Sequence, residues 1–196
     1  MTTPLPPDAG RILTGLARAS IAKQLSTQSH PDAVRTSTPE GADAAWLDAP
    51  GAVFVTLTQS GQLRGCIGSL VAHRPLRDDV VQNAQAAAFG DPRFPTLRAG
   101  EFEGTDIEVS VLSEPEPMPF TSRDDALAQL RPGIDGVILS AGFHRSTFLP
   151  QVWEELPDKE QFIGHLFRKA GLPSNYWGDD VRISRYTVTA FEERPS

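Results

Sequence analysis

Alternation of apolar and polar residues predicts a β-hairpin near the middle of the N-terminal half. Residues 53–58 alternate and are rich in β-branched side chains, and residues 63–70 supply a return strand. Ser60 and Gly61 fit a two-residue hairpin turn. With that turn, Cys66 is expected opposite Val55, and therefore on the face of the apolar residues of the first strand.

The same alternation and the 3.6-residue period predict the remaining elements. Further strands are expected at 107–111, 137–139, 146–149 and 181–191, the last with a bulge near Ser184–Arg185, where its apolar phase switches. Helices are expected at 8–25, from Pro75 to Gly90, and at 122–130, 150–156 and 158–170. Hairpins interspersed with short helices indicate an α+β fold with a mainly antiparallel sheet and flanking helices.

The elements form one domain over 1–196, since neither a repeat nor a clear linker interrupts them. Residues 1–8 are expected to form a flexible tail, and 26–51 a long loop anchored at Trp46.

Composition narrows the class of protein. The chain has 18 basic and 25 acidic residues and a net charge of −7, which argues against nucleic acid as a partner. A single cysteine allows no internal disulfide and fits a reducing cytoplasm. The sequence has neither a signal-peptide pattern nor an apolar run of the about 18 residues that a membrane span needs. We therefore expect a cytoplasmic protein without a membrane partner.

The most unusual stretch is Leu63–Leu70, where the only cysteine lies among two glycines and an arginine inside a predicted strand. A glycine within a strand costs roughly 0.5–1 kcal/mol relative to alanine. Gly65 and Gly68 therefore need a bulge, a close backbone contact or a ligand that approaches the strand.

Cys66 is the first candidate for chemistry. Arg64 could stabilise the thiolate, which is the nucleophilic form of cysteine. The alternative is that Cys66 packs as a small buried apolar residue, as most cysteines do. Residue type alone leaves both open.

Other polar candidates are less distinctive. Asp91 and Arg93 could position a polar substrate, or could simply pair with each other across a proline turn. Asp135 lies between glycines, where aspartate is also routine turn chemistry. Gln151 and Trp153 begin a predicted helix, although tryptophan is more often a core residue.

Neither a metal site nor a cofactor site is predicted. The histidines have no ligand spacing, and only His73 and His144 are plausible bases. The acidic pairs lack a calcium-loop pattern, and no glycine-rich phosphate loop is present.

Six stretches in order resemble the AMMECR-domain family, also called protein A of the AmmeMemoRadiSam system. The six stretches are Leu63–Gly68, Asp91–Phe94, Val109–Ser113, Gly133–Gly136, Phe148–Trp153 and Lys169–Pro173. The first of them is the family's hallmark, and the resemblance as a whole covers about residues 51–191.

This resemblance implies an α+β fold with a larger lobe built from both chain ends, a smaller lobe and a cleft between them. It implies a family of unestablished biochemical function, with Cys66 and Arg64 as part of its motif. The system name implies a radical-SAM protein and a Memo-like protein as partners.

Two hypotheses follow. The first is an enzyme or enzyme component that binds a small polar substrate at Leu63–Gly68, with Cys66 and Arg64 as catalytic candidates. Gly65, Gly68, Asp91, Arg93, Asp135, Gln151 and Trp153 are then the substrate-binding candidates. The second is a non-catalytic partner or adaptor of the radical-SAM and Memo-like proteins.

Overall fold

The computed structural model describes residues 5–29 and 44–193. The chain divides into two compact units, which are described separately. Unit 1 comprises Met1–Leu112 and Thr189–Ser196, and unit 2 comprises Ser113–Val188. Both units contain antiparallel strands and flanking helices, so the predicted α+β class is confirmed.

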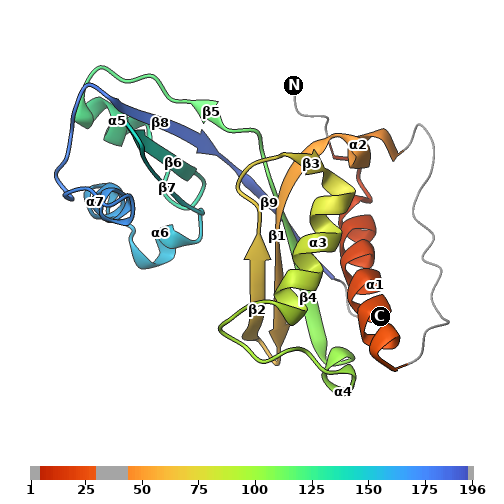
Figure 1. The fold of residues 1–196 in the computed structure, drawn as a ribbon. Helices are drawn as coiled ribbons and strands as arrows, with labels where there is room; N and C mark the ends of the chain where they lie inside the picture. The colour runs from red at the N-terminus through yellow and green to blue at the C-terminus, as the bar shows by residue number, and fades with distance from the viewer. Residues whose placement is uncertain (1–4, 30–43, 194–196) are drawn as a thin grey trace. The chain divides into compact units, whose positions relative to one another are not determined.

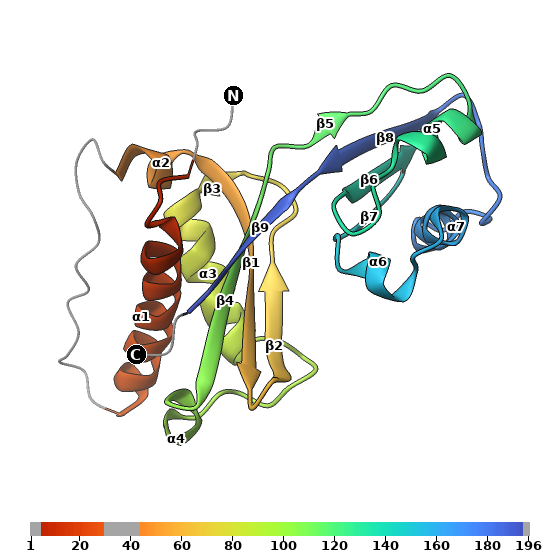
Figure 2. The ribbon, with the colours of Figure 1, turned by 180° about the vertical axis from the view of Figure 1, so that it is seen from behind.

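Unit 1 is built on an antiparallel sheet with the strand order β2-β1-β4-β9, and a short β3 pairs with β1. Figures 1 and 2 show these strands side by side, with α1 and α3 on one face of the sheet. The strands are β1 (Pro50–Gln59), β2 (Gln62–Gly68), β3 (Arg74–Pro75), β4 (Thr105–Leu112) and β9 (Val188–Glu192). The helices are α1 (Ala9–Ser29), α2 (Ala45–Asp48), α3 (Leu76–Phe89) and α4 (Ala99–Phe102).

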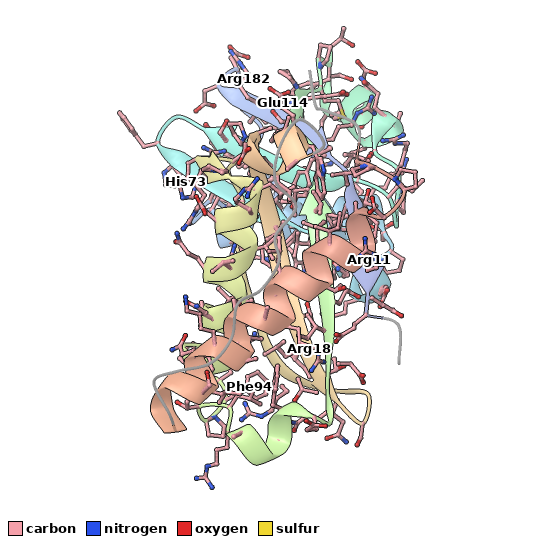
Figure 3. The ribbon with its side chains drawn as sticks, turned by 90° about the vertical axis from the view of Figure 1, so that its right-hand side faces the viewer. Arg11, Arg18, His73, Phe94, Glu114 and Arg182 are labelled. Atoms are coloured by element: carbon pink, nitrogen blue, oxygen red, sulfur yellow. The ribbon has the colours of Figure 1, made fainter. Side chains whose placement is uncertain are left out.

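The core of unit 1 lies between this sheet and its helices. In the middle of β1 and β4 every second residue is apolar, and these side chains pack against the apolar stripes of α1 and α3. The fully buried members on β1 are Val53, Val55 and Leu57. Arg18, labelled in Figure 3, projects from α1, pairs with Glu193 after β9 and donates to the Thr105 carbonyl at 2.5 Å. This contact links the N-terminal helix to the chain's C-terminal strand.

Unit 2 contains a second antiparallel sheet, with the order β5-β8-β6-β7. The strands are β5 (Glu116–Pro117), β6 (Gly136–Ala141), β7 (His144–Phe148) and β8 (Val181–Tyr186), and the helices are α5 (Arg123–Gln129), α6 (Val152–Glu155) and α7 (Lys159–Lys169). The predicted helix at 158–170 is present as α7, and the Asp158 side chain caps it by accepting a hydrogen bond from the Gln161 N–H. Phe162, Ile163 and Leu166 form the buried stripe of this helix.

The last predicted strand is two strands. Residues 181–191 were expected to form one strand with a bulge near Ser184–Arg185, but β8 pairs with β6 in regular register through both residues. The chain then leaves this sheet, and β9 joins the sheet of unit 1 beside β4. The switch in apolar phase therefore marks a change of sheet, and the predicted bulge is wrong.

The predicted loop at 26–51 is also wrong at both ends. Helix α1 continues to Ser29, and α2 and the first residues of β1 begin before residue 51. Trp46 anchors α2, where its side chain is buried. The middle of the predicted loop, residues 30–43, and residues 1–4 of the predicted tail lie outside the described residues.

Candidate functional site

A β-bulge in β2 determines where Cys66 points. Strand β2 pairs antiparallel with β1, and Cys66 lies opposite Thr56. The register shifts next to Leu57, which leaves Arg64 as the extra residue on β2. Cys66 therefore lies on the same face of the sheet as Thr56, and the Thr56 hydroxyl donates a hydrogen bond to the Cys66 sulfur at 3.4 Å.

This register corrects the predicted pairing of Cys66 with Val55. A shift of one residue moves a strand's side chains to the other face of the sheet. Val55 faces the core, whereas Cys66 faces away from α1 and α3 and is half-buried. We call this surface the Cys66 face and define it by residues that the register places together: Phe54, Thr56, Cys66, Glu108 and Ser110.

Gly65 is required by the packing of α3 on the sheet. A Cβ atom at this position would lie 2.2 Å from the Ala87 carbonyl oxygen of α3. Because that atom belongs to the helix backbone, no side-chain movement could relieve the overlap. Of the explanations for glycine in this strand, close backbone packing is the one that the geometry of Gly65 supports.

Gly68 has a different neighbour. It pairs with Phe54 across the strands, and a Cβ on Gly68 would lie 2.3 Å from the Phe54 ring. The Phe54 ring therefore fills the space that the missing side chain leaves on the Cys66 face. A substrate could reach Gly68 only if Phe54 changed its rotamer.

Asp91 and Arg93 bind the backbone of Cys66 from the loop that follows α3. β2 is an edge strand, and the Cys66 N–H donates to Asp91 Oδ2 at 2.9 Å. An Arg93 Nη nitrogen donates to the Cys66 carbonyl at 3.0 Å and to Asp91 Oδ2 at 2.7 Å. The pair thus supplies the acceptor and the donor that a neighbouring strand would provide, and it fixes Cys66 at the sheet edge.

The Asp91–Arg93 ion pair keeps a buried carboxylate in its charged form. The Asp91 side chain is 1% exposed and that of Arg93 is 54% exposed. The hydrogen bond from Arg93, helped by the N–H groups of Cys66 and Arg93, holds the pKa of Asp91 far below its ordinary value of 3.8. The pKa of Arg93 is raised above its ordinary value, mainly by its hydrogen bond to Asp91.

Arg64 is buried beside the bulge instead of being presented to solvent. Its side chain is 10% exposed and approaches Glu101 Oε2 at 3.4 Å. The pKa of Glu101 is lowered, first by the Arg98 N–H and then by Arg64. Arg64 therefore contributes to the attachment of α4 near the bulge.

Thr56, Glu108 and Ser110 were not predicted as site residues. The register places Thr56 directly opposite both Cys66 on β2 and Glu108 on β4. Ser110 is 3% exposed and donates to Glu108 Oε1 at 2.9 Å. Polar residues alternate with apolar ones over 106–110 in the sequence. That these polar residues lie on the same face as Cys66 depends on the bulge in β2.

A buried polar network holds the end of β2 against α3. Asp79 is fully buried and accepts from the Val53 N–H at 2.9 Å and from the Ser69 hydroxyl at 2.7 Å. Arg74 approaches the same carboxylate at 2.9 Å, and Asn83 donates to it at 3.0 Å. The network fixes the strand end that follows the cysteine motif.

Asp135, Gln151 and Trp153 belong to unit 2. Asp135 is fully buried, and its carboxylate accepts from the Arg131 N–H at 2.9 Å and from the Arg131 guanidinium at 2.6 Å. Trp153 stacks on Phe162 with ring centroids 3.6 Å apart and donates to the Asp135 carbonyl at 2.7 Å. Gln151 is exposed before α6. Substrate binding by these three residues stays a prediction.

The two histidines that were predicted as possible bases each lie close to a backbone carbonyl. The Nδ1 atom of His73 lies 2.8 Å from the Val71 carbonyl, and the same atom of His144 lies 2.8 Å from the Ala170 carbonyl. Within residues 5–29 and 44–193, no group of three His, Cys, Asp or Glu side chains is arranged to hold a metal ion. Among the same residues, no helix is long and apolar enough to cross a membrane.

Comparison with known proteins places this sheet and its cysteine motif in a family. The family model described as AMMECR1 matches residues 14–191. The chain belongs to the AMMECR1 family. A relative from Methanothermobacter thermautotrophicus is 38% identical over 192 residues, covering 97% of each chain. A relative from Saccharolobus solfataricus is 36% identical and covers 95% of this chain and 82% of its own.

The fold is also that of a solved AMMECR1-like structure. The crystal structure of the uncharacterized protein PH0010 from Pyrococcus horikoshii matches with a TM-score of 0.76 and 32% identity. The match covers 94% of this chain and 91% of that chain. These relatives carry no established function, so the chemistry of the AMMECR1 fold has to be argued from its residues.

Proposed function

We propose that this AMMECR1 protein is an enzyme or enzyme component that binds a small polar substrate on the Cys66 face. The observation that supports this proposal most is the paired contact of Asp91 and Arg93 with both backbone groups of Cys66. A structural cysteine in the interior would need no such support, because a thiol packs there as an apolar group. Here the supported thiol is half-buried and faces away from the core.

Each motif residue then has a different role. Cys66 is the candidate for contact with substrate, and Arg93 holds positive charge at the backbone carbonyl of the same residue. Asp91 is a positioning residue, since its carboxylate acts through the backbone of Cys66. Gly65 and Arg64 maintain the bulge that turns Cys66 to this face.

A comparison of wild type with the Cys66→Ala variant tests the proposal. Each protein is incubated with a fractionated small-molecule extract from the source cells, and mass spectrometry follows the compounds. We expect at least one polar compound to be bound or consumed only by the wild type. Identical profiles for two folded proteins would overturn the proposal.

The alternative is a non-catalytic partner in an AmmeMemoRadiSam system, in contact with a radical-SAM protein or a Memo-like protein. The motif resemblance supports this reading, and the described residues form no complete set of nucleophile, base and orienting group around Cys66. Co-purification under reducing conditions tests it. Absence of both proteins from the complex would remove the alternative, whereas association that survives Cys66→Ala would favour it.

A further inference from the structure

Cys66, Thr56 and Glu108 form a row across three strands of the Cys66 face. Thr56 lies opposite Cys66 on one side and opposite Glu108 on the other. Neighbouring strands are about 4.8 Å apart, so the backbone positions of Cys66 and Glu108 are about 10 Å apart. Extended chain covers about 3.4 Å per residue, so this span suits a molecule about three residues long.

The charges along this row are unequal. At the Cys66 end, Arg93 is paired with Asp91, and nearby Arg64 is paired with Glu101. At the other end, Glu108 is half-buried and accepts a hydrogen bond from Ser110. No Lys or Arg in the described part of the chain forms an ion pair with Glu108. Glu108 is thus a half-buried carboxylate on this face without a counter-ion among the described residues, whereas Asp106, the next same-face residue of β4, is exposed to solvent.

We infer that Glu108 selects a small molecule with a cationic group, which it binds while the rest of that molecule extends over Thr56 toward Cys66. This inference rests on the proposed function and adds the charge of the substrate. A partly buried carboxylate pays a desolvation cost that a cation recovers. The Ser110 hydrogen bond to Oε1 orients the carboxylate and leaves Oε2 to accept from an ammonium or guanidinium group.

Charge-selective modification of Cys66 tests this inference without knowledge of the substrate. The probes are two methanethiosulfonates of similar size, one with a trimethylammonium-ethyl group and one with a sulfonatoethyl group. The Cys66 sulfur forms a disulfide bond with the alkylthio sulfur of the reagent. The sulfur–sulfonyl bond breaks, methanesulfinate leaves with the electron pair, and the thiol proton passes to solvent. Cys66 is the only cysteine, so the rate reports this position alone.

We expect Glu108→Gln to lower the ratio of the cationic to the anionic rate constant by about fivefold or more. Asp106→Asn is the matched control, because it removes the same charge from the next same-face position of β4, where the side chain is exposed. This control is expected to change the ratio by less than about twofold.

Three results would overturn the inference. They are an unchanged ratio in Glu108→Gln, an equal change in Asp106→Asn, and a native Cys66 that reacts with neither reagent. If Glu108→Gln does not fold, the wild type decides: its ratio must fall as salt rises, and a salt-independent ratio counts against the inference. Charge selection by Glu108 with no compound bound or consumed in the extract experiment would remove the proposed function and leave only the charge selectivity of the Cys66 face.

Discussion

Both units contain a buried aspartate paired with a half-exposed arginine. One pair binds only within its own loop, and the other also binds the backbone of a neighbouring strand. The side chains of Asp91 and Asp135 are 1% and 0% exposed, and those of Arg93 and Arg131 are 54% and 49% exposed. Asp135 and Arg131 bind each other four residues apart and close their own loop.

Asp91 and Arg93 also reach a second segment, the edge strand β2, and bind both backbone groups of Cys66. A local pair closes a turn, whereas a pair that reaches another strand fixes the position of a distant residue. The difference indicates that the position of Cys66 is what the Asp91–Arg93 pair maintains.

The largest expected effect comes from Gly65→Ala, which would displace α3 and, with it, the following loop that carries Asp91. The new Cβ would meet the Ala87 carbonyl oxygen at 2.2 Å, so α3 must move away from β2. We expect a loss of about 3 kcal/mol or more in the free energy of unfolding, measured by urea denaturation. The control is Gly15→Ala in α1, which has no atom within 4 Å of its added Cβ and should gain about 0.5–1 kcal/mol. Equal stability of the two variants would contradict the packing of α3 on Gly65.

The two aspartates should have similar effects on stability and different effects on Cys66. Asp91→Asn and Asp135→Asn each weaken charge-assisted hydrogen bonds and should each cost about 2 kcal/mol. Alkylation of Cys66 by iodoacetamide should change at least about threefold in Asp91→Asn and stay near the wild-type rate in Asp135→Asn. Equal alkylation rates in the two variants would show that Asp91 is merely a local turn residue.

The glycine beneath Phe54 should matter less than the corresponding glycine in unit 2. Added Cβ atoms on Gly68 and on Gly136 would each lie 2.3 Å from an aromatic ring, that of Phe54 or Tyr186. Tyr186 is 2% exposed and cannot move away, whereas Phe54 is half-exposed. Gly136→Ala should therefore cost about 2 kcal/mol and Gly68→Ala about 1 kcal/mol in denaturation experiments. A larger cost for Gly68→Ala would mean that the Phe54 ring is fixed.

The smallest expected effect is the pH dependence of the stabilisation that Asp91 gives to the folded state. The folded state lowers the pKa of Asp91 below its ordinary value of 3.8, so its stabilisation is complete above that value and is lost as pH falls toward the folded pKa. The stability difference between wild type and Asp91→Asn should be constant above about pH 5 and smaller by about 1 kcal/mol at pH 3. Denaturation between pH 3 and pH 6 measures it, and a constant difference would contradict the lowered pKa.

Local patterns predicted most of the elements. The hairpin turn at Ser60–Gly61 and the end of α3 at Gly90 depend on residues close in sequence, and the structure has both. The register of β2 could not be predicted in this way. Its bulge depends on the approach of the Ala87 carbonyl to Gly65, a contact between segments about 20 residues apart.

The candidate site was predicted in part for the same reason. The motif residues Cys66, Asp91 and Arg93 were identified from the sequence, and the structure brings them together. Glu108 and Ser110 were predicted only as part of a strand at 107–111, because their alignment with Cys66 follows from strand order and register. The change of sheet after Tyr186 was missed because apolar phase cannot distinguish a bulge from a passage between sheets.

Hydrogen exchange at the Cys66 amide tests most directly whether Asp91 fixes this residue. The Cys66 N–H donates to the Asp91 carboxylate, whereas Val55 and Val109 lie on the interior strands β1 and β4. In Asp91→Ala, exchange at Cys66 should rise by about tenfold or more relative to those two amides, as expected for the loss of a hydrogen bond worth about 1.4 kcal/mol. In Asp135→Ala, the relative rate should stay unchanged. Unchanged relative exchange at Cys66 in Asp91→Ala, or an equal rise in both variants, would contradict the positioning of Cys66 by the Asp91–Arg93 pair.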